Sequence, residues 1–304
     1  MFKEKMILTL YAQTPVHMGS GVSVSYVDNP IQREKHTDFP ILASSGIKGV
    51  IRDLAERMWN DKDKVNIIFG PETGSKGGYQ DYASCISFTD AKILLYPVRS
   101  VRGVFAYITS PYVLNRFKNE LKSIIKDNLG DIPSLLNEDE ILVCSDSKLK
   151  IDNDKVALEE FIFGITSQNI DNLIGELSKY LPLEIDLKSH FAIVHDNVFK
   201  DLVKYAVEIR TRIKIDQTTG TVAEGALFTI EFVPAESVFY GFLFVTDPYK
   251  KDQSKVNDAR GVAEEMRNLL DNSIIQFGGD ETLGMGLMKV KCISYESKNL
   301  NNQI

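Results

Sequence analysis

The sequence lacks the marks of a membrane or secreted protein. No apolar run among its 304 residues approaches the roughly 18 residues that a membrane span needs. The N-terminus passes directly into a strand-like run, which is not the pattern of a signal peptide. Cysteine is scarce: the three cysteines lie far apart in apolar runs, without CxxC spacing. We therefore expect a cytoplasmic protein with buried thiols, no membrane partner, no disulfide framework and no zinc site.

An excess of positive charge is also missing, because the formal net charge is −7. The acidic residues are concentrated, since residues 131–187 hold 13 acids and 4 bases, a local net charge of −9. Subtracting −9 from −7 leaves +2 for the rest of the chain. We expect residues 131–187 to form an acidic insertion. A local basic groove is enough to attract phosphate groups, so the overall acidity does not exclude a nucleic-acid partner.

Hydrophobic periodicity predicts a mixture of strands and helices. A helix is predicted to begin near residue 44, with the Ser44-Ser45 pair as its cap. Residues 60–82 are polar and glycine-rich, which predicts a long loop. The other predicted strands are 6–12, 86–96, 103–108, 226–232 and 238–246, and the other predicted helices are 113–126, 197–209 and 256–270. Antiparallel-looking strands with separate helices indicate the α+β class.

Residues 17–52 hold an unusual density of polar chemistry between an early strand and a helix start. A histidine loop comes first, with His17, Gly19, Ser20 and Gly21; a run with Asp28, Arg33 and His36 follows; Ser45, Gly46, Lys48, Gly49 and Arg52 close it. Lys48 and Arg52 are four residues apart and share one helix face. A helix N-terminus offers free N–H groups and a partial positive charge, which suit a phosphate. The alternative is a solvated basic face on a helix that packs tightly against a sheet.

Two further patterns lie in the last third of the chain. Residues 277–287 contain Gly278, Gly279, Gly284 and Gly286, in neither a Walker nor a dinucleotide-binding arrangement. The segment is either a plain β-bend or a backbone-lined groove for a phosphate chain. Earlier, Arg210, Arg212 and Lys214 alternate with apolar residues, so they would share one face of a strand. These cations would lie either in solvent or on a nucleic-acid backbone.

These elements together resemble the RAMP superfamily of CRISPR proteins. More closely, the chain is similar to the repeated backbone subunits, subunit four, of type III-B (Cmr) effector complexes. The matching segments are residues 17–21, 27–37, 45–49, 95–100, 103–106, 224–228 and 278–286, in one order along nearly the whole chain. The run from Asp28 to Thr37 is highly specific, whereas the glycine-rich segment marks only the superfamily.

The resemblance implies a single domain over residues 1–304. Its fold would be a modified ferredoxin-like (RRM-like) palm, with inserted helical and loop segments and a protruding β-hairpin thumb at about residues 205–235. Copies would stack along a CRISPR RNA together with other Cmr subunits. The thumb would flip bases of the guide–target duplex, and the complementary single-stranded target RNA would be cut at regular intervals.

The resemblance assigns the cut to Asp28. Attack by the RNA's own 2′-OH on the adjacent phosphate needs in-line geometry, a proton acceptor and charge stabilisation. A free carboxylate with a pKa near about 4 is a poor base at neutral pH. We therefore expect Asp28 to hold a divalent cation, Mg²⁺ or Mn²⁺, or to orient the reactants. Its candidate partners are His17, His36, Arg33 and Lys35, and of these His17 matches the family better and is the candidate catalytic residue.

The residues expected to contact RNA come from all three regions, and they are Gly19, Ser20, Gly21, Arg33, Ser45, Lys48, Arg52, Arg210, Arg212, Lys214, Gly278, Gly279, Gly284 and Gly286. One departure from the family is evident. Members tend to carry Glu-Glu-Tyr where this chain has Ile230-Glu231-Phe232, so we expect Glu231 to be a sheet-edge acid.

Two other functions compete with an RNA-guided endoribonuclease. The first is a scaffold subunit that binds guide RNA without cutting it, and the presence of Asp28 in a matching loop argues against it. The second is a small-molecule enzyme that uses the glycine-rich segment as a phosphate site, which predicts a closed pocket there.

Overall fold

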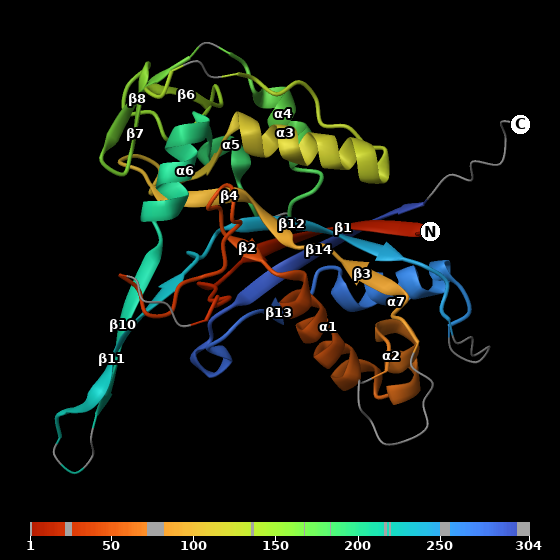
Figure 1. Cartoon of the computed structure of the whole chain (residues 1–304). Helices are drawn as coiled ribbons and strands as arrows, with labels where there is room; N and C mark the ends of the chain where they lie inside the picture. Colours follow the sequence, from red (N-terminus) through yellow and green to blue (C-terminus); the bar gives the residue numbers. More distant parts are fainter. Residues whose placement is uncertain are drawn as a thin grey trace, which may run out of the picture.

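A large, mostly antiparallel sheet runs through the molecule, with helices on both of its faces (Figure 1). The computed structural model describes residues 2–21, 26–71, 82–134, 137–166, 168–182, 184–215, 218, 220–249 and 256–296. Within these residues, no helix is both long and apolar enough to cross a bilayer.

Four strands form the centre of the palm, in the spatial order β14-β1-β12-β4 with every pair antiparallel. A long helix lies in the connection between the first two of them in the chain, and another lies between the last two. The elements are β1 (Glu4–Ala12), α1 (Ser44–Trp59), β4 (Ala91–Arg99), β12 (Val238–Val245), α7 (Ala259–Leu270) and β14 (Leu287–Glu296). This βαββαβ arrangement is the ferredoxin-like fold, so the predicted palm is confirmed.

Short elements complete the palm. Strand β2 (Ile41–Leu42) pairs with β4, β3 (Ile86–Phe88) with β12, and β13 (Ile274–Gln276) with β14 at the edge of the sheet. Helices α1, α2 (Lys62–Phe69) and α7 lie together on one side of the sheet (Figure 1). Strands β1 and β12 are buried along most of their length because helices cover both faces of the sheet.

All residues between β4 and β12 form one long insertion into the palm. Its first part widens the same sheet in the order β4-β5-β9-β6-β8-β7. The elements are β5 (Phe105–Thr109), α3 (Pro111–Glu120), a π-helical turn (Leu121–Ile125), β6 (Glu140–Val143), β7 (Lys155–Leu158), β8 (Phe161–Ile165), α4 (Asp171–Leu177), α5 (Leu187–His190), β9 (Phe191–Val194) and α6 (Asp196–Tyr205). The acidic segment 131–187 therefore supplies three strands to the sheet as well as loops and helix α4.

The thumb follows α6 as a separate two-stranded sheet. Strand β10 (Glu208–Ile215) pairs with β11 (Val222–Phe232), and the register places Thr211 opposite Thr229. The hairpin projects from one end of the molecule, away from the rest of the insertion (Figure 1). The thumb expected at about residues 205–235 is this hairpin.

The predicted helix cap and the predicted long loop were wrong. The residue before α1 is Ala43, which makes no side-chain cap; Asp90 Oδ1 accepts the Ser44 N–H at 2.7 Å instead. Part of the loop predicted at 60–82 is helix α2, which Asp61 caps by accepting the Lys64 N–H. Residues 72–81 of that loop lie outside the described residues. The prediction of buried thiols is confirmed, since all three cysteines are buried.

Candidate nucleic-acid interface

The polar loop of residues 26–33 lies along the edge of β11 that does not pair with β10. The Asn29 N–H donates to the Thr229 carbonyl at 3.1 Å, and the Glu231 N–H donates back to the Asn29 carbonyl at 3.0 Å. A segment from the start of the chain thus acts as a short third strand at the base of the thumb. This pairing satisfies backbone groups that an edge strand would otherwise leave open.

Asp28 is exposed at this edge and is held by a single residue of the thumb. Its Oδ2 accepts the Thr229 N–H at 2.8 Å and the Thr229 hydroxyl at 2.9 Å, and its own N–H donates to the Thr229 Oγ1 at 3.1 Å. These hydrogen bonds, above all the one from the Thr229 N–H, hold the pKa of Asp28 below its usual range. Within the described part of the chain, Oδ1 accepts no hydrogen bond from another residue. The carboxylate is therefore fixed at one oxygen and open at the other.

His17 lies on the same strand edge. Its Nδ1 is 2.7 Å from the Glu231 carbonyl oxygen, and its ring packs at a tilt against Phe232. Because a carbonyl only accepts, Nδ1 carries a proton, and in the neutral ring Nε2 is then the basic atom. Thr229 and Glu231, which hold Asp28 and His17, are two residues apart, about 7 Å along a strand. The structure therefore brings the two predicted catalytic residues to one edge.

The side chain of Glu231 connects strand β11 to the loop of residues 26–33. Its side chain is buried, with Oε1 2.6 Å from Arg33 Nη2 and Oε2 accepting the Ile31 N–H at 2.9 Å. The expectation of an ordinary sheet-edge acid missed this role, because the loop of residues 26–33 covers the edge. No local sequence pattern shows that partnership, since Arg33 and Glu231 are 198 positions apart.

The glycine-rich segment packs against His17 through its backbone. A Cβ on Gly278 would lie 2.3 Å from the His17 carbonyl oxygen, so no side chain fits there. The Gly279 N–H donates to the same oxygen at 2.8 Å. On its other side, Asp280 Oδ1 pairs with Arg212 Nη1 at 2.7 Å. The histidine loop, the glycine-rich segment and the base of the thumb are thus one packed unit.

A groove of about 530 Å³ lies between α1 and strand β13, with Glu281 and Leu287 also in its lining. Gly49, Asp53 and Arg57 line it from α1, and Gln276 and Glu281 line it from the opposite side. A Cβ on Gly49 would meet no atom within 4 Å, so this helix face is open. None of Gly278, Gly279, Gly284 and Gly286 lines this groove, so the backbone-lined groove for a phosphate chain stays a prediction.

Three of the cations predicted to contact RNA, Arg33, Lys48 and Arg52, are partly buried or hydrogen-bonded within the protein. Arg52 donates to the Gly70 carbonyl at 2.7 Å and to Asn66 Oδ1 at 2.9 Å, which fastens α2 to α1. Arg33, besides its pair with Glu231, donates to the backbone carbonyl of Asp38. Lys48 is half-buried, and its pKa is lowered by burial and then by the nearby Arg52 charge. Their contacts with RNA stay predictions.

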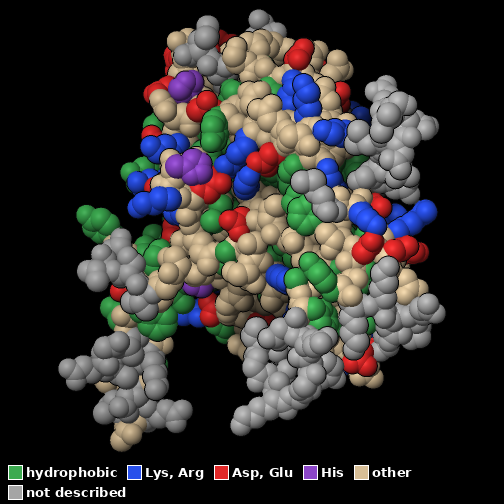
Figure 2. Space-filling model, turned by 45° about the vertical axis from the view of Figure 1, so that its right-hand side comes forward, with side chains coloured by type: hydrophobic (Ala, Val, Ile, Leu, Met, Phe, Trp, Pro, Cys, Tyr) green, Lys and Arg blue, Asp and Glu red, His purple; other side chains and the backbone are tan. Residues whose placement is uncertain are grey.

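The remaining predicted RNA contacts lie at or near the same region. Ser20 and Ser45 are exposed, and a Cβ on Gly284, whose φ is 72°, would meet no atom within 4 Å. Arg210 packs over the Phe232 ring, and the side chain of Lys214 lies outside the described residues. On the face shown in Figure 2, Lys and Arg side chains are interspersed with acidic ones and do not gather in one stripe.

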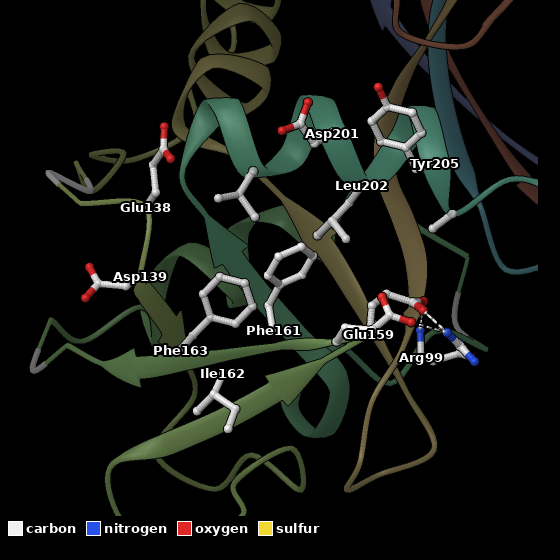
Figure 3. A pocket seen from close by; sticks show the side chains of 13 residues that line it. Arg99, Glu138, Asp139, Glu159, Phe161, Ile162, Phe163, Asp201, Leu202 and Tyr205 are labelled. Carbon is white, nitrogen blue, oxygen red and sulfur yellow. Dashed lines mark hydrogen bonds and ion pairs between the residues drawn. The ribbon is translucent and has the colours of Figure 1, made fainter.

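A second cavity, of about 610 Å³, lies in the insertion and contains none of the predicted site residues. Phe161, Phe163 and Leu202 line it, and Glu138 and Asp201 stand at its border (Figure 3). Its walls come from β8 and α6, and not from the glycine-rich segment. The small-molecule enzyme, which predicted a closed pocket at that segment, gains no support from this cavity.

The structure combines a ferredoxin-like palm, a hairpin thumb and a histidine loop packed on a glycine-rich turn. This combination defines a class of proteins, and comparisons with known proteins point to the same class. A family model described as the RAMP superfamily matches residues 9–289. The chain is 39% identical over 293 residues to the CRISPR system Cmr endoribonuclease Cmr4 of Pyrococcus furiosus, covering 93% of this chain and 94% of that protein.

Solved structures agree with the sequence relatives. The crystal structure of oligomeric Cmr4 from Pyrococcus furiosus matches with a TM-score of 0.74 and 32% identity, over 97% of this chain and 99% of that one. A chain of the type III-B Cmr-beta complex bound to cognate target RNA matches with a TM-score of 0.73 and 21% identity, over 96% and 98% of the two chains, which shows a shared fold. The chain belongs to the RAMP superfamily and, within it, to the Cmr4 family.

Proposed function

We propose that this protein is the repeated backbone subunit of a type III-B CRISPR RNA-guided effector complex. Copies lie side by side along a CRISPR RNA, together with other Cmr subunits in the cytoplasm, and cleave complementary single-stranded target RNA at regular intervals. Support comes from the Cmr4 relatives, one named an endoribonuclease and one crystallised as an oligomer. The observation that carries the proposal is the exposed Asp28 carboxylate, held at the base of the thumb on the strand edge that also holds His17.

The site fits cleavage by the RNA's own 2′-OH. A regular A-form helix holds this hydroxyl out of line with the adjacent phosphate, and a nucleotide displaced by the thumb regains the in-line geometry. Attack joins the 2′-oxygen to phosphorus as a 2′,3′-cyclic phosphate and breaks the bond from phosphorus to the 5′-oxygen of the next nucleotide. That oxygen takes a proton from water and leaves as a hydroxyl. His17 Nε2 accepts the proton of the 2′-OH. Asp28, whose lowered pKa makes it a weaker base than a free carboxylate, orients the reacting nucleotide through its open oxygen.

A divalent cation, Mg²⁺ or Mn²⁺, is the proposed cofactor. The described residues contain no group of three or more His, Cys, Asp or Glu side chains that could hold a metal ion alone. Mg²⁺ at nucleic-acid sites keeps several waters and uses one or two carboxylates with phosphate oxygens. The single open oxygen of Asp28 would hold an ion that arrives with the RNA, and through that ion Asp28 would orient the nucleotide. Such an ion would stabilise the negative charge that develops on the phosphate.

The test is an Asp28→Asn variant in the reconstituted complex. We expect unchanged assembly and target binding, and loss of target cleavage at every regular site. Asp38→Asn is the matched control, because this carboxylate lies in the same connection between β1 and β2 but pairs with Lys204 at 3.3 Å. Continued cleavage by the Asp28→Asn complex would refute the assignment.

The same assay separates the non-catalytic scaffold from the nuclease. A scaffold would bind guide and target RNA and leave the target intact when Mg²⁺ or Mn²⁺ is added. The nuclease cuts under those conditions, and EDTA stops it.

A further inference from the structure

We propose that Thr229 is the positioning residue of Asp28, so that the thumb strand itself sets the orientation of the cleavage carboxylate. This inference rests on the proposed function of Asp28. Thr229 belongs to β11 and lies 201 positions from Asp28 in the chain. No local sequence pattern around either residue indicates that the two are in contact.

The geometry is a reciprocal clamp. The Thr229 hydroxyl donates to Asp28 Oδ2 at 2.9 Å and accepts the Asp28 N–H at 3.1 Å. The Thr229 N–H adds a third hydrogen bond, to the same Oδ2 at 2.8 Å. One hydroxyl therefore fixes both the backbone and the side chain of Asp28. Donors on Oδ2 leave Oδ1 as the oxygen available to RNA.

The other anchors of the loop hold its neighbours. Asn29 is paired with the β11 backbone, and Ile31 and Arg33 are held by Glu231. Among the residues that the structure describes, Thr229 alone hydrogen-bonds Asp28. Removing the hydroxyl would therefore loosen the carboxylate while the rest of the loop stays in place.

The location of the clamp joins two parts of the reaction. Strand β11 carries Thr229 and, two residues on, the Glu231 carbonyl that orients His17. The same strand is half of the thumb that meets the duplex. Cleavage carboxylate, candidate base and thumb thus share one rigid element, and a side chain on a strand is placed more accurately than one on a free loop.

Thr229→Val tests the clamp. Valine keeps the shape and strand preference of threonine but removes the hydroxyl, whereas the backbone N–H bond survives. Thr211→Val is the matched control, because Thr211 is the exposed residue directly opposite on β10 and lies on the same face of the hairpin. Thr229→Ser, which restores the hydroxyl, is the rescue variant. Each is assayed in the reconstituted complex for single-turnover cleavage rate, half-saturating target concentration and melting temperature.

We expect Thr229→Val to lower the rate at saturating target about tenfold or more, since a small misplacement of a reacting group costs up to about 100-fold. The half-saturating target concentration should change by less than about twofold, because only positioning is lost. Thr211→Val should match the wild type, and Thr229→Ser should recover most of the rate.

Three results would overturn the inference. They are a Thr229→Val rate close to that of the wild type, a serine variant as slow as the valine variant, and an equal loss of rate and melting temperature in both valine variants. The Asp28→Asn complex in the same series separates this failure from that of the proposed function. If Asp28→Asn still cuts, Asp28 is not the cleavage residue; if it does not cut and Thr229→Val does so at full rate, only the clamp is wrong.

Discussion

Replacing Gly278 with alanine should disrupt the contact between the glycine-rich segment and His17 and destabilise the fold. Gly278 has a φ of 83°, where an L-residue costs about 1–2 kcal/mol. The new Cβ would also lie 2.3 Å from the His17 carbonyl oxygen and 2.9 Å from its carbon, both backbone atoms that cannot turn aside. Relieving that overlap costs about a further 1–3 kcal/mol. We expect the free energy of unfolding to fall by about 2–5 kcal/mol.

Gly284→Ala is the matched control for this prediction. Gly284 has a similar φ of 72°, but no atom lies within 4 Å of the Cβ position. Only the conformational cost of about 1–2 kcal/mol applies there. Equilibrium urea unfolding of the isolated subunit, followed by circular dichroism, measures both variants. Equal losses in the two variants would refute the close approach as the reason for glycine at position 278.

Three further predictions concern stability and reactivity. Glu231→Ala should lower the free energy of unfolding by about 3–5 kcal/mol, because it leaves the largely buried Arg33 charge without its partner; a loss below about 1 kcal/mol in urea unfolding would contradict this. Burial, with the hydrogen bond to Asp127, raises the pKa of Tyr295 to about 12, against about 10 in an unfolded chain. The neutral hydroxyl therefore stabilises the fold fully below about pH 10 and loses this effect as the pH rises toward 12; Tyr295→Phe should flatten that part of the pH–stability curve. Burial raises the pKa of all three cysteine thiols to about 12, so a thiol reagent at pH 8 should react with none of them in the native protein and with all after unfolding.

Much of the palm could be predicted from the sequence because its signals are long. Strand β1 and helix α7 each show a continuous pattern of buried positions, and resemblance to a family supplied the thumb. The strands of the acidic insertion escaped prediction because they are only four or five residues long, and so short a run shows little periodicity.

The residues of the site, like the elements of the fold, could be predicted only in part. Asp28 and His17 stand in local motifs that a resemblance can find, but the residues that hold them come from a distant strand. Thr229 and Glu231 look like ordinary strand residues until the loop folds onto β11. Arg52 is the opposite case, since its local motif is clear but gives no sign that its guanidinium donates to Asn66 and to the Gly70 carbonyl. Local sequence shows which chemical groups are present, and only tertiary contacts show which of them are already used.

The most direct test of the central claim is a cleavage pattern from mixed filaments. Complexes are reconstituted with wild-type and Asp28→Asn subunits in known ratios, and the target RNA fragments are measured in single-turnover reactions. Each copy should make its own cut, so every regular site should lose cleavage in proportion to the fraction of the variant, with target binding unchanged. Cleavage at all sites that does not depend on the fraction of Asp28→Asn would show that Asp28 is not the cleavage residue and would contradict the central claim.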